Sequence, residues 1–588
     1  MKDNQTLFTK HLPVPGDKSR RVPTGREAYH IVDHMQKWEQ IVFISFLAIA
    51  ILSVVTLVYK TSHKFMTKVP ASGGSFTEGF VGSPLHINPV IARSTTVDSD
   101  LVMLTHSGLL RRDKFGEFIP DLAENYIISE DGLEYTFTLR DNLEWHDGEE
   151  LTIEDVLYTI NLIKNEDYKS PRIRNFDGVQ VIPTGDREIK FILEEAYSPF
   201  LAAMTVGILP KHIWENVSVE QFGFDEHNLD KVVGSGPYKI KKVIRGGSSV
   251  SSIIFEPFKN FVFGSPYLKR VKVNFYTDED ALLSDILAGK VDSAGSLSTG
   301  VAKDLQGSDH KLIQTPLPKV YAAFFNQDKN ELLPNSNIRE ILDGTVDKHR
   351  IIEEALRGFG RALDGPLPDN YLMAPSDTTN KTNRAISLLE DGGWKLGEDG
   401  VRTKKKERLS FTISTFNIPE LTQVASILKK NWEDIGAEVN IKTYDATDIK
   451  QNIVPERDYD ILLSGQGYQE IIDPSPLWHS RFRLHPGLNV ALYTSVDADR
   501  ILDQLRVEYN IEKRITLMNE FSNRIRKDKP AIFLYVPDYI YLPAKDIRGI
   551  DLSNISNKSE RYNEVYKWHS TQESVWKSLD RHIFTRVI

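Results

Sequence analysis

Few side chains in this sequence have the types and spacing that catalysis or metal binding requires. Ser426 and Lys429 stand three apart, as in penicillin-binding serine enzymes, but no Lys-Thr-Gly element accompanies them. They also fall on an amphipathic helical pattern, which favours a solvated helix face. His30 and His34 stand four apart, so a helix would align them for zinc, with Asp33 nearby. A helix at a membrane interface is the favoured interpretation of that pair.

The other motifs of common enzymes are missing from the sequence. It has no HExxH zinc motif, no GxSxG nucleophile elbow and no phosphate-binding loop ending in Gly-Lys-Ser/Thr. It has no cysteine, which excludes disulfides, cysteine-bound zinc, thiol catalysis and a lipid-modified N-terminal cysteine. We therefore predict a protein that is not an enzyme and that uses no catalytic residue, metal or cofactor.

Length and charge narrow the class of protein further. A chain of 588 residues exceeds what one hydrophobic core usually serves, so more than one domain is expected. The formal net charge is −10, and no basic stripe with interleaved aromatic residues occurs. We expect an ordinary soluble surface and no nucleic-acid partner.

An uncharged apolar run, residues 41–59 (IVFISFLAIAILSVVTLVY), has the composition of a membrane span. At a rise of about 1.5 Å per residue, it just crosses a hydrocarbon core of roughly 30 Å. A cleaved signal peptide is the alternative, with Val69-Pro70-Ala71 as its cleavage site. About 40 residues precede the run, more than a signal peptide carries, so an uncleaved anchor is favoured. Basic residues flank both sides, so charge alone does not set the orientation.

Helical and strand patterns alternate through the rest of the chain, which predicts an α/β or mixed class. Residues 279–291 and 421–435 have helical periodicity, and residues 411–416 alternate as a strand.

The most informative stretch is 131–156 (DGLEYTFTLRDNLEWHDGEELTIEDV). Tyr135, Phe137 and Leu139 alternate with polar residues, which predicts a half-buried strand. The residues His146-Asp147-Gly148 predict a turn, and Thr152 followed by acidic residues predicts the start of a helix. The whole stretch resembles the signature of the family 5 solute-binding proteins, the oligopeptide-binding receptors of ABC importers.

Further motifs resemble those of the same family and follow in its order. Gly234 and Gly236, for example, lie in an element similar to the family's GTGPY turn, where two glycines permit a sharp turn into a strand. The matching positions are 82–89, 108–110, 120–124, 208–212, 234–238, 287–289, 347, 392–394, 459–460, 478–480, 497, 514 and 530–535. The resemblance therefore covers nearly all of the chain beyond the apolar run.

The resemblance implies an α/β, two-lobed periplasmic-binding-protein-like fold of the large class with an extra subdomain, here preceded by one transmembrane helix. Carried onto this sequence, it gives a cytoplasmic segment 1–40, an anchor 41–59 and a linker 60–74. Lobe I comprises 75–106, 210–318 and 540–588, its subdomain 107–209, and lobe II 319–539. Closing such lobes on a ligand is a hinge motion.

The resemblance also implies the partners. We expect an extracytoplasmic monomeric body that delivers peptides or peptide-like solutes to the permease subunits of an ABC importer. Residues 41–59 would lie in the cell membrane as a single span, with the N-terminus in the cytoplasm. A tethered sensor or adhesion module stays open, because the N-terminal segment is long enough to meet a cytoplasmic partner. A receptor for a non-peptide solute also stays open.

Receptors of this family bind an extended peptide by pairing its backbone with strands of both lobes, like an added β-strand. The resemblance places one contact segment on the first lobe, one residue in the subdomain after a Ser-Pro step, and one segment on lobe II. The predicted ligand-binding residues are Ser94, Thr95, Thr96, Arg172, Gly465, Gln466, Gly467 and Tyr468.

The sequence departs from the family pattern at two positions. The usual Gly-Trp reads Gly465-Gln466, which replaces an aromatic wall by an amide. The aspartate that pairs with a peptide's α-ammonium group aligns with Ile471. Glu470 is adjacent, but neighbouring residues of a strand face opposite ways. A buried ammonium group without a carboxylate is costly, so we expect little preference for a free N-terminus.

Overall fold

The computed structural model describes residues 35–93, 97–308, 310–368, 381–468 and 473–576. The chain divides into two compact units, Pro70–Gln572 and a smaller unit made of Met1–Val69 with Glu573–Ile588. The predicted residues Ser94, Thr95, Thr96, Glu470 and Ile471 lie outside the described residues.

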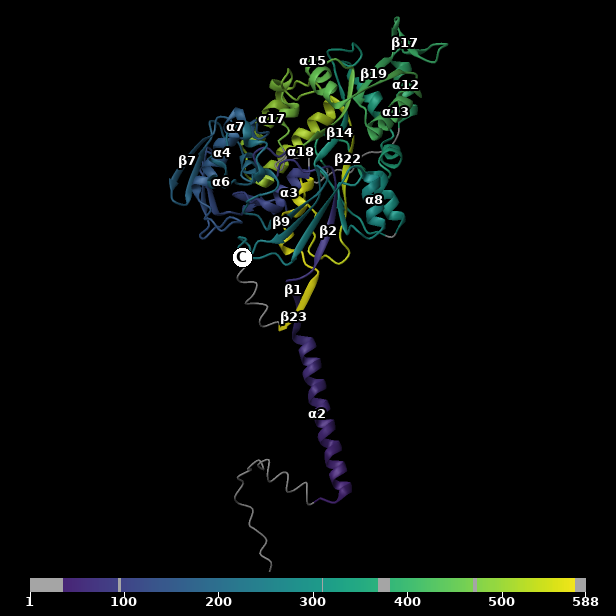
Figure 1. Ribbon diagram of the computed structural model, residues 1–588. Helices are drawn as coiled ribbons and strands as arrows, with labels where there is room; N and C mark the ends of the chain where they lie inside the picture. Colours follow the sequence, from purple (N-terminus) through teal and green to yellow (C-terminus); the bar gives the residue numbers. More distant parts are fainter. Residues whose placement is uncertain (1–34, 94–96, 309, 369–380, 469–472, 577–588) are drawn as a thin grey trace, which may run out of the picture. The chain divides into compact units, whose positions relative to one another are not determined.

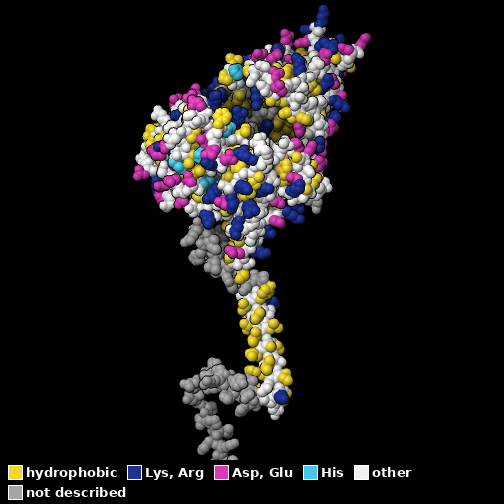
Figure 2. All heavy atoms as spheres, viewed as in Figure 1, with side chains coloured by type: hydrophobic (Ala, Val, Ile, Leu, Met, Phe, Trp, Pro, Cys, Tyr) yellow, Lys and Arg dark blue, Asp and Glu magenta, His cyan; other side chains and the backbone are white. Residues whose placement is uncertain are grey.

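The smaller unit contains a long apolar helix, α2 (Lys37–Phe65). Residues Lys37–Thr61 are long and apolar enough to cross a membrane, a test that a signal sequence also passes. The apolar side chains of this span are exposed to solvent, and they gather along the helix in Figure 2. The hydroxyl groups of Ser45 and Thr56 donate to carbonyls four residues earlier, at 2.8 and 2.7 Å, so they add no unpaired donor.

Part of the predicted linker 60–74 is a strand. β1 (Met66–Ala71) pairs with β23 (Thr571–Trp576) in a two-stranded sheet. The prediction rested on the small residues after position 70, and local composition carries no sign of a partner strand from the other end of the chain.

The larger unit is built on one mixed sheet of twelve strands (Figure 1). Its order is β20 (Glu438–Tyr444), β19 (Ser410–Phe416), β21 (Ile461–Gly467), β14 (Lys319–Phe325), β22 (Ala531–Leu542), β12 (Ser293–Gly295), β2 (Ser75–Val81), β11 (Arg270–Tyr276), β10 (Ser249–Pro257) and β9 (Tyr238–Gly246). β13 (Ile313–Pro316) and β15 (Gly360–Ala362) also pair with β22.

The long strand β22 joins two halves of this sheet. Its first part pairs with β14, and its second part pairs with β13 and β12. We call the strands from β20 to β14 the second half, and those from β12 to β9 the first half. The chain passes between the halves twice, between β13 and β14 and within β22. The passages are adjacent, since the Leu317 N–H donates to the carbonyl of Pro537 at 3.3 Å.

Both faces of the second half are covered by helices, so its strands are apolar on both sides. Along β14, Ala323 and Phe325 enter one core, while Val320, Ala322 and Phe324 enter the other. The covering helices are α10 (Ser336–Gly344), α12 (Thr382–Asp391) and α13 (Pro419–Glu433) on the first face, and α16 (Ser475–Trp478), α17 (Val496–Val507) and α18 (Ile511–Asp528) on the second.

The first half is also packed on two sides. One core includes α3 (Val97–Thr105) and the C-terminal residues around Tyr562 and Trp568, and the other includes α8 (Glu279–Leu287) and α9 (Thr299–Gly307). The helices predicted at 279–291 and 421–435 and the strand at 411–416 are thus confirmed as α8, α13 and β19, since their periodicity reflects one buried face.

A four-stranded antiparallel sheet forms a separate layer, in the order β5 (Ala123–Ile128), β6 (Glu134–Leu139), β8 (Glu188–Ile192) and β7 (Gln180–Gly185). Tyr135, Phe137 and Leu139 of β6 are buried, as their alternation predicts. Helix α4 (Ile153–Lys164) begins after Thr152, whose N–H donates to Asp155 at 2.8 Å.

Shorter elements complete the larger unit. They are β3 (Leu110–Arg112), β4 (Phe118–Pro120), α5 (Phe200–Ala203), α6 (Lys211–Trp214), α7 (Val219–Phe222), α11 (Lys348–Arg350), β16 (Lys395–Leu396), β17 (Arg402–Lys404), β18 (Glu407–Arg408), α14 (Ala446–Asp448) and α15 (Val454–Glu456).

Candidate ligand-binding site

His146, in the most distinctive motif of the sequence, holds two layers of the fold together. Its Nδ1 accepts the N–H of Gly234 at 3.2 Å, and its Nε2 donates to the carbonyl of Gly236 at 3.0 Å. Burial lowers the pKa of His146 to about 4, so the imidazole is neutral at physiological pH. Both ring nitrogens are used within the protein, which makes this motif a structural junction.

The two glycines at this junction allow a close backbone approach. A Cβ on Gly234 would lie 1.9 Å from the carbonyl oxygen of Thr105, and one on Gly236 would lie 2.5 Å from the Thr105 carbonyl carbon. Only glycine fits here, because backbone atoms cannot rotate away as a flexible side chain can.

The second glycine pair, at the end of β21, has an open backbone edge. On one side β21 pairs with β14, with Gly465 opposite Tyr321 and Gly467 opposite Lys319. The Tyr468 N–H donates to the Pro318 carbonyl at 2.8 Å, so the alternation of an antiparallel ladder turns the N–H and C=O groups of Gly465 and Gly467 the other way.

On that other side, β19 pairs with β21 only as far as Leu463. Beyond Leu463, no strand among the described residues pairs with β21 on the side that faces away from β14. We call the backbone groups of Gly465 and Gly467 on this side the glycine edge.

At Gly467, the outer residue of the glycine edge, space as well as hydrogen-bonding capacity is free. Gly467 is exposed, and no described atom lies within 4 Å of a Cβ built on it. Its backbone is not in the left-handed region, so conformation does not require glycine at this position. The absence of a side chain leaves the face of β21 open at this position.

The two other predicted residues of this segment are turned into the protein. Gln466 is buried on the opposite face of β21. Tyr468 packs in the core around Trp478, and its hydroxyl donates to the carbonyl of Pro366. Burial raises the pKa of Tyr468 above its ordinary value.

Sequence reasoning missed two side chains of β14 that lie against the glycine edge. The ammonium group of Lys319 lies 4.8 Å from the centre of the Tyr321 ring, and that ring stacks on Tyr535 with centroids 4.7 Å apart. A Cβ on Gly465 would lie 2.8 Å from both Lys319 and Tyr321. Pro316 and Pro318, which flank the passage just before β14, were the only signal that this strand begins at the boundary between the halves.

Arg172 is bonded to residues that precede the other predicted contact segment in the sequence. Its guanidinium donates to the carbonyl of Ala92 at 2.8 Å, and Ser170 donates to the carbonyl of Val90 at 2.6 Å. Arg172 is therefore tied to the turn around Ala92, which precedes positions 94–96 in the sequence. It lies in the region of the first half, whereas the glycine edge lies in the second.

Comparison with known protein families identifies the chain. Residues 117–483, more than half of the sequence, match the model of the bacterial extracellular solute-binding proteins, family 5. The chain belongs to this family. As a family 5 solute-binding protein of ABC transporters, it is a member of a family of substrate-binding receptors, and the resemblance that the sequence predicts is confirmed.

Curated relatives of this family 5 protein extend along most of its length. The oligopeptide-binding protein AppA of Bacillus subtilis is 26% identical over 514 residues, which cover 84% of this chain and 93% of AppA. The dipeptide-binding protein of Escherichia coli is 22% identical over 534 residues, covering 85% and 94%.

Solved structures share the mixed α/β periplasmic-binding-protein-like fold. AppA from Bacillus subtilis in complex with a nonapeptide aligns with a TM-score of 0.65 at 24% identity, over 85% of this chain and 99% of that one. NikZ from Campylobacter jejuni in complex with Ni(L-His) aligns with a TM-score of 0.66 at 26% identity, over 84% and 99%.

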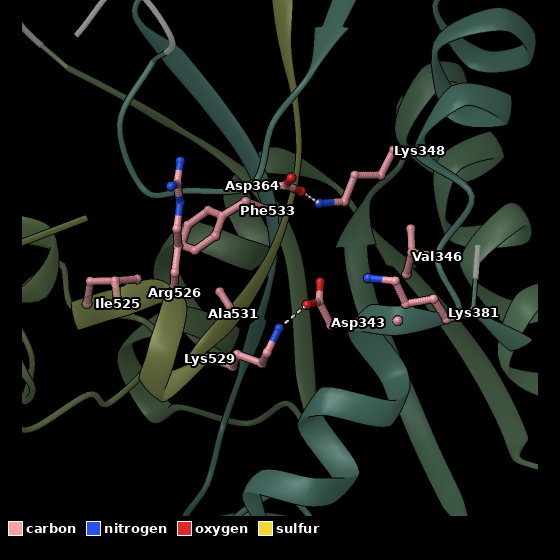
Figure 3. A pocket seen from close by; sticks show the side chains of 11 residues that line it. Asp343, Val346, Lys348, Asp364, Lys381, Ile525, Arg526, Lys529, Ala531 and Phe533 are labelled. Carbon is pink, nitrogen blue, oxygen red and sulfur yellow. Dashed lines mark hydrogen bonds and ion pairs between the residues drawn. The ribbon is translucent and has the colours of Figure 1, made fainter. Parts of the chain in front are cut away.

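This family 5 protein also has a charged cavity of about 220 Å³ in the second half. Figure 3 shows that two ion pairs cross it, Lys348 with Asp364 and Lys529 with Asp343. Its lining is Asp343, Gly344, Val346, Lys348, Asp364, Lys381, Ile525, Arg526, Lys529, Ala531 and Phe533. None of the predicted site residues lines this cavity. In the described part of the chain, no group of three or more His, Asp or Glu side chains is placed to hold a metal ion.

Proposed function

We propose that this protein is a membrane-anchored receptor that binds peptides or peptide-like solutes outside the cytoplasm and delivers them to the permease subunits of an ABC importer. The glycine edge carries this proposal. Two glycines expose consecutive outward-facing backbone groups of β21, and an extended peptide satisfies such groups by adding a strand. AppA, which aligns over most of this chain, was solved with a nonapeptide.

We assign the sheet halves to two lobes, with lobe I at 75–106, 210–318 and 540–588, its subdomain at 107–209 and lobe II at 319–539. The two adjacent passages support a hinge, because bending there needs changes in only two short segments. Pro318 and Pro537 in these passages lack N–H groups, and β15 pairs with β22 across the second passage, at residues 535–537. Ligand that contacts both lobes would favour the closed form.

The ligand would lie between the glycine edge of lobe II and the segment of Ser94, Thr95 and Thr96 beside Arg172 on the lobe I side. On the face drawn in Figure 2, the larger unit is hollowed, with hydrophobic and basic side chains around the opening. Ligands commonly bind in such hollows between domains. Gln466 and Tyr468 do not contact the ligand in this arrangement, since their side chains are buried and their backbone groups face β14.

Helix α2 would hold the receptor in the membrane, with residues 1–40 in the cytoplasm. Its exposed apolar side chains are stable in lipid and costly in water. We expect the full-length protein in the membrane fraction, with residues beyond Lys60 open to external protease. A mature N-terminus close to Ser72 would instead identify α2 as a cleaved signal sequence.

The identity of the ligand is best approached by mass spectrometry of molecules that co-purify with the full-length protein. We expect peptides, and competition between matched free and acetylated peptides should show less than about a tenfold difference in affinity. The reason is Ile471, which stands where relatives hold an aspartate. A strong preference for the free amine would mean that another acid, such as Glu470, binds it.

A receptor for a non-peptide solute is the second candidate, and the alignment with NikZ in complex with Ni(L-His) favours it. Co-purification of a metal chelate without any peptide would support this candidate over peptide transport. A sensor or adhesion role would be supported if the protein binds peptide but no permease subunits associate with it.

A further inference from the structure

The ammonium group of Lys319 lies beside the glycine edge without a carboxylate partner among the described residues. Three other lysines of lobe II are paired with a carboxylate: Lys348 with Asp364, Lys529 with Asp343, and Lys329 with Asp458. Lys319 instead lies over the ring of Tyr321, at 4.8 Å from its centre. A cation on an aromatic face keeps its capacity to bind an anion, because the ring supplies no negative charge to neutralise it.

Two features hold Lys319 in position. Tyr321 is itself fixed by its stack on Tyr535, with an angle of 11° between the rings. Gly465 leaves the space that the lysine chain occupies, since a Cβ there would lie 2.8 Å from Lys319 Cε. A side chain fixed before binding loses little conformational entropy when the ligand arrives.

Lys319 is also within reach of a strand added at the glycine edge. It is the cross-strand neighbour of Gly467 on β14, and its chain extends diagonally across the sheet toward Gly465. A peptide along the far side of β21 would therefore place its side chains or its terminus one strand away from this ammonium group.

Two other charged groups near this position, Glu420 and Arg361, cannot replace Lys319 as the cation for a ligand carboxylate. Glu420, in the first turn of α13, lies near enough to Tyr535 to add to the effect of burial and of Tyr321 in raising that tyrosine's pKa. Arg361 of β15 pairs with Asp538 of β22 at 3.8 Å. Glu420 can favour a positive group of the ligand, whereas the Arg361 pair is internally compensated. Lys319 is the cation that a ligand carboxylate can meet.

We propose that Lys319 makes this receptor selective for peptides that carry a carboxylate near the segment bound at the glycine edge. The carboxylate belongs to an Asp or Glu side chain or to the peptide's C-terminus. This inference rests on the proposed function. An ammonium–carboxylate hydrogen bond is stronger than a neutral one, and it strengthens further when lobe closure excludes water.

The test uses full-length protein in lipid nanodiscs and synthetic nonapeptides of otherwise neutral sequence. One series moves a single glutamate along the peptide, with glutamine at the same position as its control, and a second series compares free and amidated C-termini. Calorimetry should show that one charged form binds about tenfold or more tightly than its neutral partner. A difference between Glu and Gln identifies a side chain, and a difference on amidation identifies the terminus.

Substitution of Lys319 separates this role from general effects. Lys319→Met should reduce the preference to about twofold or less, and Lys319→Arg should keep most of it, because arginine retains the charge. The matched control is Lys430→Met, which removes an exposed lysine from α13 and should leave the preference unchanged.

The outcomes distinguish this inference from the proposed function. If charged and neutral nonapeptides bind wild-type protein equally, or if Lys319→Met keeps the preference, the selectivity assigned to Lys319 is wrong while peptide binding stands. If no nonapeptide binds the wild type, the proposed function itself fails and the inference fails with it. Thermal unfolding of each variant confirms that the fold is unchanged.

Discussion

Two glycine pairs of this protein look alike in sequence and differ in what surrounds them. At Gly234 and Gly236, an added Cβ would enter the backbone of α3 at 1.9 and 2.5 Å. At Gly467, an added Cβ would meet no described atom within 4 Å. The first pair lies at the junction with His146, and the second lies at the open end of β21.

This difference separates the two glycines that the fold requires from Gly467, which the described fold does not require. Where the protein's own backbone fills the space, the loss of glycine must damage the protein itself. Where the space is empty and the backbone conformation is ordinary, as at Gly467, the described residues give glycine no structural reason, so a substitution there should leave the fold intact. Substitutions at Gly234 and at Gly467 are therefore expected to give opposite results, whereas Gly465 is crowded by the side chains of Lys319 and Tyr321.

The largest effect is expected at the junction. Gly234→Ala would force a methyl group against the Thr105 carbonyl and should lower the free energy of unfolding by about 3 kcal/mol or more. Gly246→Ala in β9 is the control, since its nearest contact is an ordinary 3.6 Å and its cost should stay below about 1 kcal/mol. Equal stability of the two variants in denaturant unfolding would contradict the requirement for glycine at 234.

At the glycine edge, the effect should fall on binding instead of stability. Gly467→Val should weaken peptide binding by at least about a hundredfold, or about 2.8 kcal/mol, because the branched side chain occupies the path of the ligand backbone. The fold should remain intact, since the added atoms meet no described neighbour. Calorimetry with the co-purified peptide measures the binding affinity, and thermal unfolding measures whether the fold is intact.

Gly185→Val in β7 provides the matched control for this prediction. It places the same side chain on an exposed strand outside lobe II, with only Glu188 near it at 3.8 Å, and should bind ligand like the wild type. Unchanged affinity of Gly467→Val would place the binding strand elsewhere in the protein.

A smaller effect is expected from pH, which should change the stability of the junction at His146. The pKa of His146 is about 4 in the folded protein, below its ordinary 6.5, because burial disfavours the charged form. The unfolded chain therefore takes up the proton first as the pH falls. The contribution of His146 to stability is complete above pH 6.5 and is lost as the pH falls toward 4, with about 2 kcal/mol lost by pH 5.

His146→Gln tests this, because its amide can still donate to Gly236 but does not titrate. Between pH 7 and pH 5, the free energy of unfolding should decrease in both proteins. The decrease should be about 2 kcal/mol smaller in the variant than in the wild type. His106, whose pKa burial lowers to about 3, remains in both proteins and contributes equally. Identical pH dependence of the two proteins would rule out His146 as a source of acid sensitivity.

Local sequence patterns predicted the strands and helices whose neighbouring elements also show a periodic pattern. The alternation of Tyr135, Phe137 and Leu139 predicted β6, and the acidic residues after Thr152 predicted the start of α4. The strand β1 was missed because β23, its partner, comes from the other end of the chain. A sequence shows which residues can pair, but it does not show which distant strand is present.

The candidate site was reached from the sequence only through family resemblance. That resemblance indicated Gly465 and Gly467, but it gave no sign that Tyr468 is turned into a core or that Lys319 lies over Tyr321. These contacts depend on the register between β14 and β21, whose sequences are far apart and have no pattern that fixes their alignment.

The sequence by itself determined the family of this protein, its apolar N-terminal helix and the periodicity of its main elements. These follow from the order of residue types, because burial of one face imposes a period on neighbouring positions. Only the tertiary structure decided which glycines are crowded and which are open, and that Lys319 has no carboxylate partner among the described residues. Those properties depend on atoms from distant segments, and packing brings such atoms to within a few ångströms only after the chain has folded.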